Sequence, residues 1–343
     1  NAAGEPSGFA MQNIKQKETN YDFIATYKNT WNKLNLVALL GTNINIQNFY
    51  NSSQSTSGGL YIPGVYTIAN SASAPAIPLT VDISKRIVGV FGQASLGYDG
   101  TYYVEGTLRR DESTALPTNN NAYWYYSGSG SIIFSNWDFL KGGILSFGKL
   151  RASYAEVGSD TSANQLLNQY FNTTSFLGNP VYFYNNIAKQ PNLKPQRSKQ
   201  TEFGINMQFL KNRLGFDVAW FQNDSFDQIL SLPVSVANGY SSQVQNAGNL
   251  RTKGFEVSLK LSPIRTNNFK WDIDVNWSNP LTRVTELATG VENITLGSYQ
   301  GGVTINASLD DLYGTIKGTD FIYTNGQKTV GSNGRYLFTS TTN

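Results

Sequence analysis

Residues Glu202–Phe209 read EFGINMQF, and residues Trp271–Trp277 read WDIDVNW. Apolar and polar residues alternate in both stretches, so a strand would carry its apolar side chains on one face and its polar side chains on the other. The same alternation recurs at Tyr102–Arg109, Leu214–Trp220 and Phe255–Leu261. These stretches predict an all-β chain whose strands separate two unlike environments, which are either core and water or lipid and water.

The composition excludes several classes of function. Charged residues make up 14% of the 343 residues and aromatic residues 13%, whereas soluble domains are usually about 25% charged. The chain has no cysteine and no histidine, and its net charge is +3. Disulfide chemistry, thiolate catalysis and histidine catalysis are therefore excluded, and nucleic acid is not an expected partner. No cofactor and no metal site are expected.

The lengths of the predicted strands favour a membrane β-barrel over a membrane helix. The longest aliphatic run is Leu36–Leu40, far short of the ~20 apolar residues that a membrane helix needs. A barrel strand needs only about 9–11 residues, and its residues alternate. We predict eleven strand segments, near residues 21–28, 33–47, 84–98, 101–111, 123–135, 147–157, 199–210, 213–227, 243–262, 269–279 and 312–323.

Long and short connections alternate between these segments. If the strands are antiparallel, the short links fall at one end of the sheet and the long links, of which 48–83 and 158–198 are the longest, at the other. Outer-membrane barrels show this asymmetry, with short periplasmic turns and long outer loops. Aromatic residues near strand ends also suit the interfacial level of a bilayer, namely Trp31, Tyr98, Tyr102, Trp137, Phe139, Trp271 and Trp277.

Five stretches, in chain order, carry a family likeness: Val90–Asp111, which is a tyrosine-rich hairpin ending in Arg-Arg-Asp, then Lys149–Asp160, Asn192–Ser198, Asn246–Glu256 and Tyr313–Phe321. Together they resemble the SusC/RagA-type TonB-dependent transporters of the bacterial outer membrane. The resemblance implies an antiparallel transmembrane β-barrel of roughly 22 strands. Residues 1–343 would form a partial barrel domain from its C-terminal half, with the plug domain and the C-terminal strands absent.

The resemblance also implies partners and a location. A SusD-like lipoprotein would close the outer mouth, TonB would act through the missing plug segment, and outer-membrane lipid would surround the barrel. The expected function is import of oligosaccharides or oligopeptides across the outer membrane, without catalysis.

The polar face of the strands is expected to line the lumen. A Lys or Arg on the lipid side near the midplane would cost about 2–4 kcal/mol, which assigns the charged residues of the alternating strands to the inside. The predicted lumen-facing residues are Glu105, Arg109, Arg151, Glu202, Glu256, Lys260, Asp272 and Asp274.

Two aromatic groups are candidates for ligand contact in the outer loops. The run Tyr123, Trp124, Tyr125 and Tyr126 could stack on a sugar or peptide ligand. We favour the alternative that it forms the outer aromatic girdle, with alternate rings facing lipid headgroups. Tyr182 and Tyr184 lie within a predicted long loop; they could contact the lid protein or pack within the loop.

Three other functions fit parts of the pattern. A secreted β-sandwich adhesin or carbohydrate-binding protein would explain the alternation without lipid, but not the sorting of the loops. A passive porin is opposed only by the family resemblance. A β-rich glycosidase would need two carboxylates, such as Asp111 and Glu256, that converge across a cleft. Asp272–Asn276 superficially resembles the start of a calcium loop but lacks the glycine and the bidentate glutamate.

Overall fold

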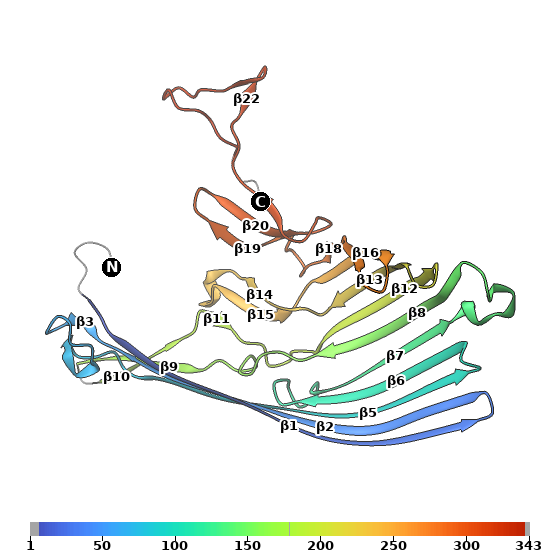
Figure 1. Cartoon of the computed structure of the whole chain (residues 1–343). Coiled ribbons are helices and arrows are strands. Elements are labelled where there is room, and N and C mark those ends of the chain that lie inside the picture. The colour runs from blue at the N-terminus through green and yellow to red at the C-terminus, as the bar shows by residue number, and fades with distance from the viewer. Residues whose placement is uncertain (1–6, 178, 340–343) are drawn as a thin grey trace.

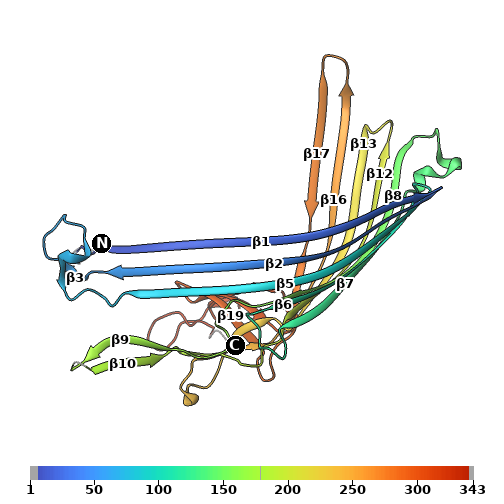
Figure 2. The ribbon, with the colours of Figure 1, turned by 90° about the horizontal axis from the view of Figure 1, so that it is seen from below.

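The computed structural model describes residues 7–177 and 179–339. One large antiparallel sheet of eleven strands dominates it. The sheet is a single curved layer, shown in Figure 1 and, from below, in Figure 2. Neighbours in the sheet are also neighbours in the chain, apart from short strands inserted in the loops. The fold class predicted from the sequence is confirmed.

The strands of the large sheet follow one another in chain order. They are β1 (Ala10–Trp31), β2 (Leu34–Ser55), β5 (Leu79–Tyr98), β6 (Tyr102–Ser113), β7 (Ala122–Ile132), β8 (Leu145–Ser159), β12 (Gln196–Phe209), β13 (Leu214–Phe226), β16 (Asn249–Arg265), β17 (Lys270–Ser278) and β18 (Leu281–Glu286). β17 and β18 both pair with β16, along its two halves, so they act as one strand interrupted at Asn279 and Pro280.

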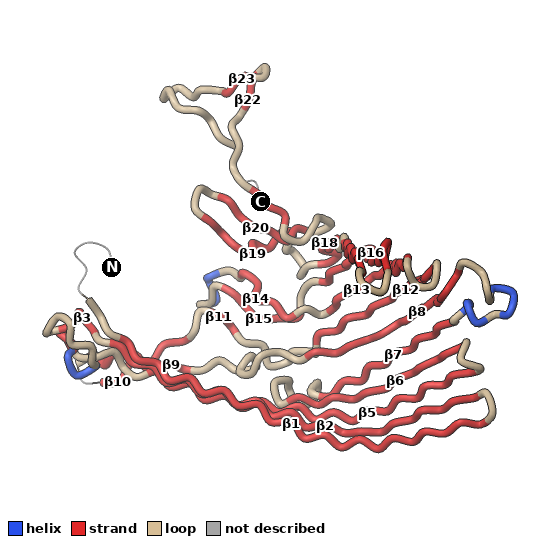
Figure 3. The backbone as a smooth tube through the Cα atoms, in the orientation of Figure 1, coloured by secondary structure: helices blue, strands red, loops and turns tan. Residues whose placement is uncertain are grey.

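The connections are sorted by length, as expected. Figure 3 shows short turns at one end of the sheet, the turn end, and long segments at the other, the loop end. At the β5–β6 turn, Asp99 and Gly100 have φ of 53° and 63°, the backbone of a tight hairpin turn that Asp-Gly favours. The β7–β8 link is longer and holds the 3-10 helices η2 (Phe134–Asn136) and η3 (Asp138–Leu140).

The loop end carries small sheets of its own. They comprise β3 (Ser57–Leu60) with β4 (Ser71–Ser73), β9 (Tyr170–Phe176) with β10 (Asn179–Tyr184), and β11 (Ile187–Ala188) with β15 (Ser242–Asn246) and β14 (Ile229–Pro233). Beyond β18 lie β19 (Asn293–Tyr299), β20 (Val303–Ser308), β21 (Thr315–Lys317), β22 (Tyr323–Thr324) and β23 (Gln327–Lys328). Two further 3-10 helices are η1 (Ile68–Asn70) and η4 (Val236–Asn238).

Two of the predicted segments were wrong in detail. The segment 312–323 is no strand of the large sheet, since only Leu312 bridges Arg283 and β21 joins a separate three-stranded sheet. Gly314, with φ of 90°, turns the chain away after that bridge. The segment 243–262 is divided into β15 and β16, because Gly248 has φ of 97°, outside the range of a regular strand.

The first two strands are much longer than predicted, since β1 and β2 each have 22 residues. Polar side chains pair across the two strands. Asn45 Nδ2 donates to Glu18 Oε1 at 2.6 Å where the extension begins, and Gln12 Nε2 donates to Asn51 Oδ1 at 3.1 Å within it. This part lacks apolar alternation, so hydrophobic periodicity could not reveal it. The β2–β5 register is continuous, so the apolar run Leu36–Leu40 causes no slip.

Candidate functional site

The large sheet has an apolar face and a polar face, which its register defines. On the apolar face, directly paired residues cross the whole sheet in one row: Trp31, Leu34, Tyr98, Tyr102, Ile132, Leu150, Ile205, Val218, Val257 and Trp277. Phe203 is 55% exposed and Val275 50% exposed on this face. A β-sandwich would cover such side chains with a second layer, whereas here they are bare.

The polar face carries the complementary row, one residue further along each strand. Its members are Thr30, Asn35, Gly97, Tyr103, Ser131, Arg151, Gly204, Ala219, Glu256 and Ser278. The register places all the residues predicted to be lumen-facing on this same face, namely Glu105, Arg109, Arg151, Glu202, Glu256, Lys260, Asp272 and Asp274.

Arg151 is the centre of a charge cluster on the polar face. Its Nε lies 3.1 Å from Glu202 Oε1, and its Nη2 lies 2.8 Å from Asp217 Oδ1. Asn206 Nδ2 donates to the other Asp217 oxygen at 2.7 Å. Gly204 makes room for this arrangement, because a Cβ there would lie 2.4 Å from Arg151 Cζ. The cluster joins β8, β12 and β13 through one guanidinium.

A second cluster surrounds Arg109, nearer the loop end. Arg109 Nε lies 2.8 Å from Asp111 Oδ1, and the guanidinium lies over the Phe91 ring at 5.2 Å. Tyr125 donates its hydroxyl to Asp111 Oδ2 at 2.5 Å. Asp111 is thus held by two neighbours on its own face of the sheet.

The aromatic run 123–126 is divided between the two faces. Tyr123 pairs with Asp111 and Tyr125 pairs with Arg109, so both lie on the polar face, where their rings stack at 6.1 Å. Trp124 and Tyr126 lie on the apolar face and are more than half exposed. Only Trp124 and Tyr126 have the position that a lipid-facing girdle requires.

Tyr123 belongs to a small hydrophobic core at the loop end. It packs with Leu116, Leu193 and Val244, which come from three different connecting segments. Asn246 strengthens the same junction through two hydrogen bonds to the Lys194 backbone. Its Oδ1 accepts from the Lys194 amide at 2.8 Å, and its Nδ2 donates to the Lys194 carbonyl at 2.9 Å. These segments therefore form one packed unit instead of independent loops.

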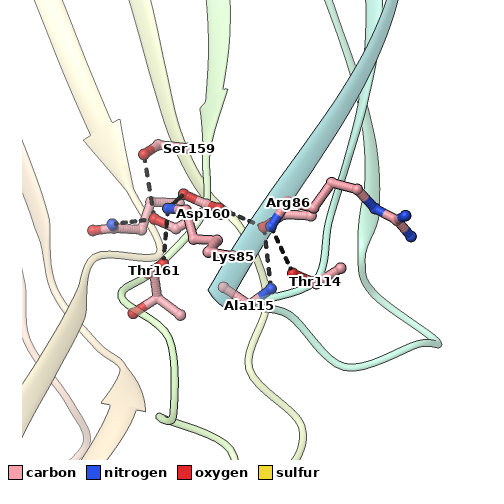
Figure 4. A network of polar contacts seen from close by, with 9 residues as sticks. Lys85, Arg86, Thr114, Ala115, Ser159, Asp160 and Thr161 are labelled. Atoms are coloured by element: carbon pink, nitrogen blue, oxygen red, sulfur yellow. Dashed lines mark hydrogen bonds and ion pairs between the residues drawn. The ribbon is translucent and has the colours of Figure 1, made fainter. Parts of the chain in front are cut away.

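A polar network fastens this unit to the strands (Figure 4). Asp160 Oδ1 lies 3.0 Å from Lys85 Nζ, and its other oxygen accepts from the hydroxyl of Ser113, which is fully buried. Gln196 donates to the Asp160 carbonyl at 3.4 Å and accepts from the Ile229 amide at 3.1 Å. The network links β5, β6, β12 and β14 at the point where the 160–195 segment begins.

The β9–β10 hairpin projects from that segment, as Figure 2 shows. Tyr184 donates its hydroxyl to that of Tyr170, and their ring centroids are 4.0 Å apart. Tyr182 is 60% exposed. Behind the hairpin, Lys189 Nζ donates to Gln165 Oε1 at 2.8 Å, and burial lowers the pKa of Lys189. The candidates Tyr182 and Tyr184 thus lie apart from the run 123–126.

The geometry disfavours hydrolysis by the carboxylate pair considered above. Asp111 on β6 and Glu256 on β16 are five strand spacings apart in the sheet, about 24 Å, whereas a glycosidase pair lies within about 10 Å. Asp111 is also occupied by Arg109 and Tyr125.

Sequence reasoning did not single out Asp160, Lys85, Ser113, Asp217 or Asn206. Asp217 and Asn206 could have been found, because each occupies a polar position of an alternating strand. The Asp160 network joins residues 75 positions apart in the chain, and no local pattern indicates it.

Comparison with known proteins shows the family. The family model described as "TonB dependent receptor-like, beta-barrel" matches residues 3–341. TonB-dependent receptor P3 of Formosa agariphila is 28% identical over 211 residues, which cover 60% of this chain and 21% of that protein. TonB-dependent receptor SusC of Bacteroides thetaiotaomicron is 25% identical over 213 residues, which cover 59% and 21%. The chain spans about a fifth of the length of these relatives.

Solved structures show the same fold. The RagAB peptide transporter superposes with a TM-score of 0.80 at 20% identity, over 96% of this chain and 37% of that chain. The ferripyoverdine receptor of Pseudomonas aeruginosa, of the outer membrane, superposes with a TM-score of 0.51 at 12% identity, over 96% and 41%. No helix within residues 7–177 and 179–339 is long and apolar enough to cross a bilayer. The chain belongs to the TonB-dependent receptor β-barrel family and is an outer-membrane protein.

Proposed function

We propose that residues 1–343 form part of the barrel wall of a TonB-dependent importer of oligosaccharides or oligopeptides. The observation that carries this proposal is the division of the sheet into one continuous apolar row and one continuous polar row. The apolar face contacts lipid, and the polar face lines a passage for a hydrophilic cargo. No bond of the cargo is made or broken.

The loop end faces the outside in this proposal. The packed unit of Leu116, Tyr123, Leu193 and Val244 partly covers the mouth, and a SusD-like lipoprotein closes it. In this proposal the exposed side chains of Tyr182 and Tyr184 contact the cargo or the lipoprotein. TonB acts on a plug segment of the importer. The relatives named SusC and RagAB support the choice of oligosaccharides or peptides as the cargo class.

The test uses the full-length protein that contains this chain. Its gene is deleted, and growth of the deletion strain is measured on a panel of oligosaccharides and oligopeptides as sole nutrients. Uptake of the same compounds by wild-type cells is measured with and without an uncoupler of the proton gradient. We expect loss of growth on one class, and loss of the same uptake in wild-type cells when the gradient collapses. Uptake that survives the uncoupler would identify a passive porin, and recovery of the protein outside the outer membrane would reject both.

A further inference from the structure

Cations gather on the apolar face between its aromatic row and the loop end. Phe203, Trp220 and Phe255 form a directly paired aromatic row across β12, β13 and β16. Two residues further toward the loop end, Lys253 occupies the next row, beside Gln222. The first charged side chain that this part of the face presents is therefore a cation directly above an aromatic row.

The row after that contains three cations and two acids. Its directly paired members, in order from β8 to β18, are Glu156, Lys199, Asp224, Arg251 and Arg283. Glu156 is engaged by Arg197 of the next row at 3.4 Å, and Lys199 Nζ lies 5.3 Å from the centroid of the Phe226 ring. Arg251 Nε lies 2.5 Å from Asp224 Oδ1, so this acid is also engaged. Arg283 donates from Nη1 to the Asp310 carbonyl at 3.3 Å, a neutral partner that holds the side chain but leaves its charge uncompensated.

This arrangement is unfavourable unless an anion is present. Like charges directly opposite each other on neighbouring strands repel, and Arg251 and Arg283 are such a pair. Both side chains are exposed, so they can reach a ligand outside the sheet. The five side chains of the row carry a net charge of one positive unit, and Lys253 and Arg197 in the two flanking rows raise the local charge to three positive units.

The position of the row identifies the anion. It lies four residues beyond the aromatic row, about 13 Å along a strand that is tilted in the bilayer, so it lies at the outer border of the lipid-facing surface, where headgroups replace hydrocarbon. We propose that Lys199, Arg251 and Arg283, with Lys253 below them, bind the phosphate of a lipid headgroup in the outer leaflet. This site is independent of what the barrel transports.

The same order recurs on the opposite flank of the sheet. On β1 the apolar-face residues Tyr21 and Phe23 are followed, toward the loop end, by Lys17, and on β5 Val88 is followed by Arg86. The neighbouring strand β6 carries the Arg110–Glu112 ion pair on this face, which adds no net charge. Figure 4 shows the Arg86 side chain pointing away from Lys85 and Asp160, so it lies on the lipid side of the strand. The cationic level is therefore a feature of the outward surface on both flanks.

The test measures lipid selectivity of the full-length protein in nanodiscs of phosphatidylcholine with a minor fraction of phosphatidylglycerol. Native mass spectrometry gives the ratio of the two lipids that stay bound. We expect the wild-type protein to enrich phosphatidylglycerol and the variant K199Q/R251Q/R283Q to lose the enrichment. The single variant R283Q should weaken it about fivefold, the contribution of one cation near a headgroup. Heat-modifiable mobility on a gel confirms that each variant is folded.

The matched control K28Q/K149Q/K260Q removes the same charge from the polar face of the sheet. It should retain the enrichment. Equal loss in the control, or unchanged enrichment in both R283Q and the triple variant, would overturn the proposal. Inorganic phosphate is added in a parallel arm. Displacement of the bound lipid by inorganic phosphate at physiological concentration would assign the site to a soluble anion and also overturn it.

Discussion

At the scale of single residues, glycines decide where the charged side chains of the polar face can lie. Gly204 admits the Arg151 guanidinium, Gly89 admits that of Arg109, and Gly158 admits the ring of Tyr123; a Cβ at each would lie 2.3–2.4 Å from the neighbour. A glycine inside a strand costs conformational entropy, and here the close approach of a large side chain from the next strand compensates it.

The substitution Gly204→Ala should therefore destabilise the barrel. Its new Cβ would displace the Arg151 guanidinium, which holds Glu202 and Asp217, and overpacking of this kind costs about 1–3 kcal/mol. The free energy of unfolding in detergent measures the loss. Gly215→Ala is the matched control, because its Cβ would meet nothing nearer than Gln208 Cγ at 3.5 Å. Equal stability of the two variants would show that the Arg151 cluster adapts without cost.

Neighbouring residues of one strand should respond oppositely to the same new charge. Leu259 pairs with Phe216 and Val275 on the apolar face, whereas Ser258 pairs with Asp217 and Asn276 on the polar face. Leu259→Lys should cost about 2–4 kcal/mol, the depth-dependent cost of a lysine near the bilayer midplane. Ser258→Lys should be close to neutral. Unfolding in lipid vesicles distinguishes them, and a reversed order would mean that the two faces are wrongly assigned.

At the scale of elements, the segment 160–195 begins at a residue that anchors it. Asp160 and Lys85 are both largely buried, with side chains 11% and 16% exposed. Asp160→Asn removes the charge that Lys85 faces and weakens a charged hydrogen bond, worth about 1.5–3 kcal/mol. The segment should then open more often, and limited proteolysis within it should be at least about tenfold faster.

The control for this experiment is Asp138→Asn, which removes an exposed carboxylate at the turn end. It should leave cleavage of the 160–195 segment unchanged. Unaltered proteolysis in Asp160→Asn would mean that the core of Leu116, Tyr123, Leu193 and Val244 holds the segment closed by itself.

The sequence predicted the strands that cross the membrane and could not predict what lies beyond them. Alternation located β12, β13 and β17 because lipid on one face and water on the other force it. The extended parts of β1 and β2 are rich in polar residues on both faces and contain amide pairs such as Gln12 with Asn51, so their sequence has no hydrophobic period. The Asp160 network depends on contacts between distant segments, which local patterns do not encode.

The same limit applies to the candidate site. The polar-face residues followed from alternation alone, and the register places them together. Alternation also separates Tyr123 and Tyr125 from Trp124 and Tyr126, as expected for a girdle in which alternate rings face the lipid. Alternation does not predict the burial of Tyr123. This side chain is only 5% exposed because three loop segments converge on it.

At the scale of the whole molecule, the described sheet is open. Among the described residues β1 pairs only with β2, and the far edge is formed by β17 and β18; Figure 1 shows β1 far from β16 and β18. An open edge exposes a row of unpaired backbone donors and acceptors, which water can satisfy but lipid cannot. The sheet therefore requires further strands to stand in a membrane.

Residues 1–343 expressed alone should consequently fail to form a membrane barrel. Refolded into detergent, they should associate through their edges into oligomers and show no heat-modifiable mobility, whereas the full-length protein should be a closed, heat-modifiable species. Size-exclusion chromatography and gel mobility measure both properties. A monomeric, heat-modifiable fragment would contradict this expectation, because it would require β1 to pair with β17 and would show that eleven strands can close a smaller barrel by themselves.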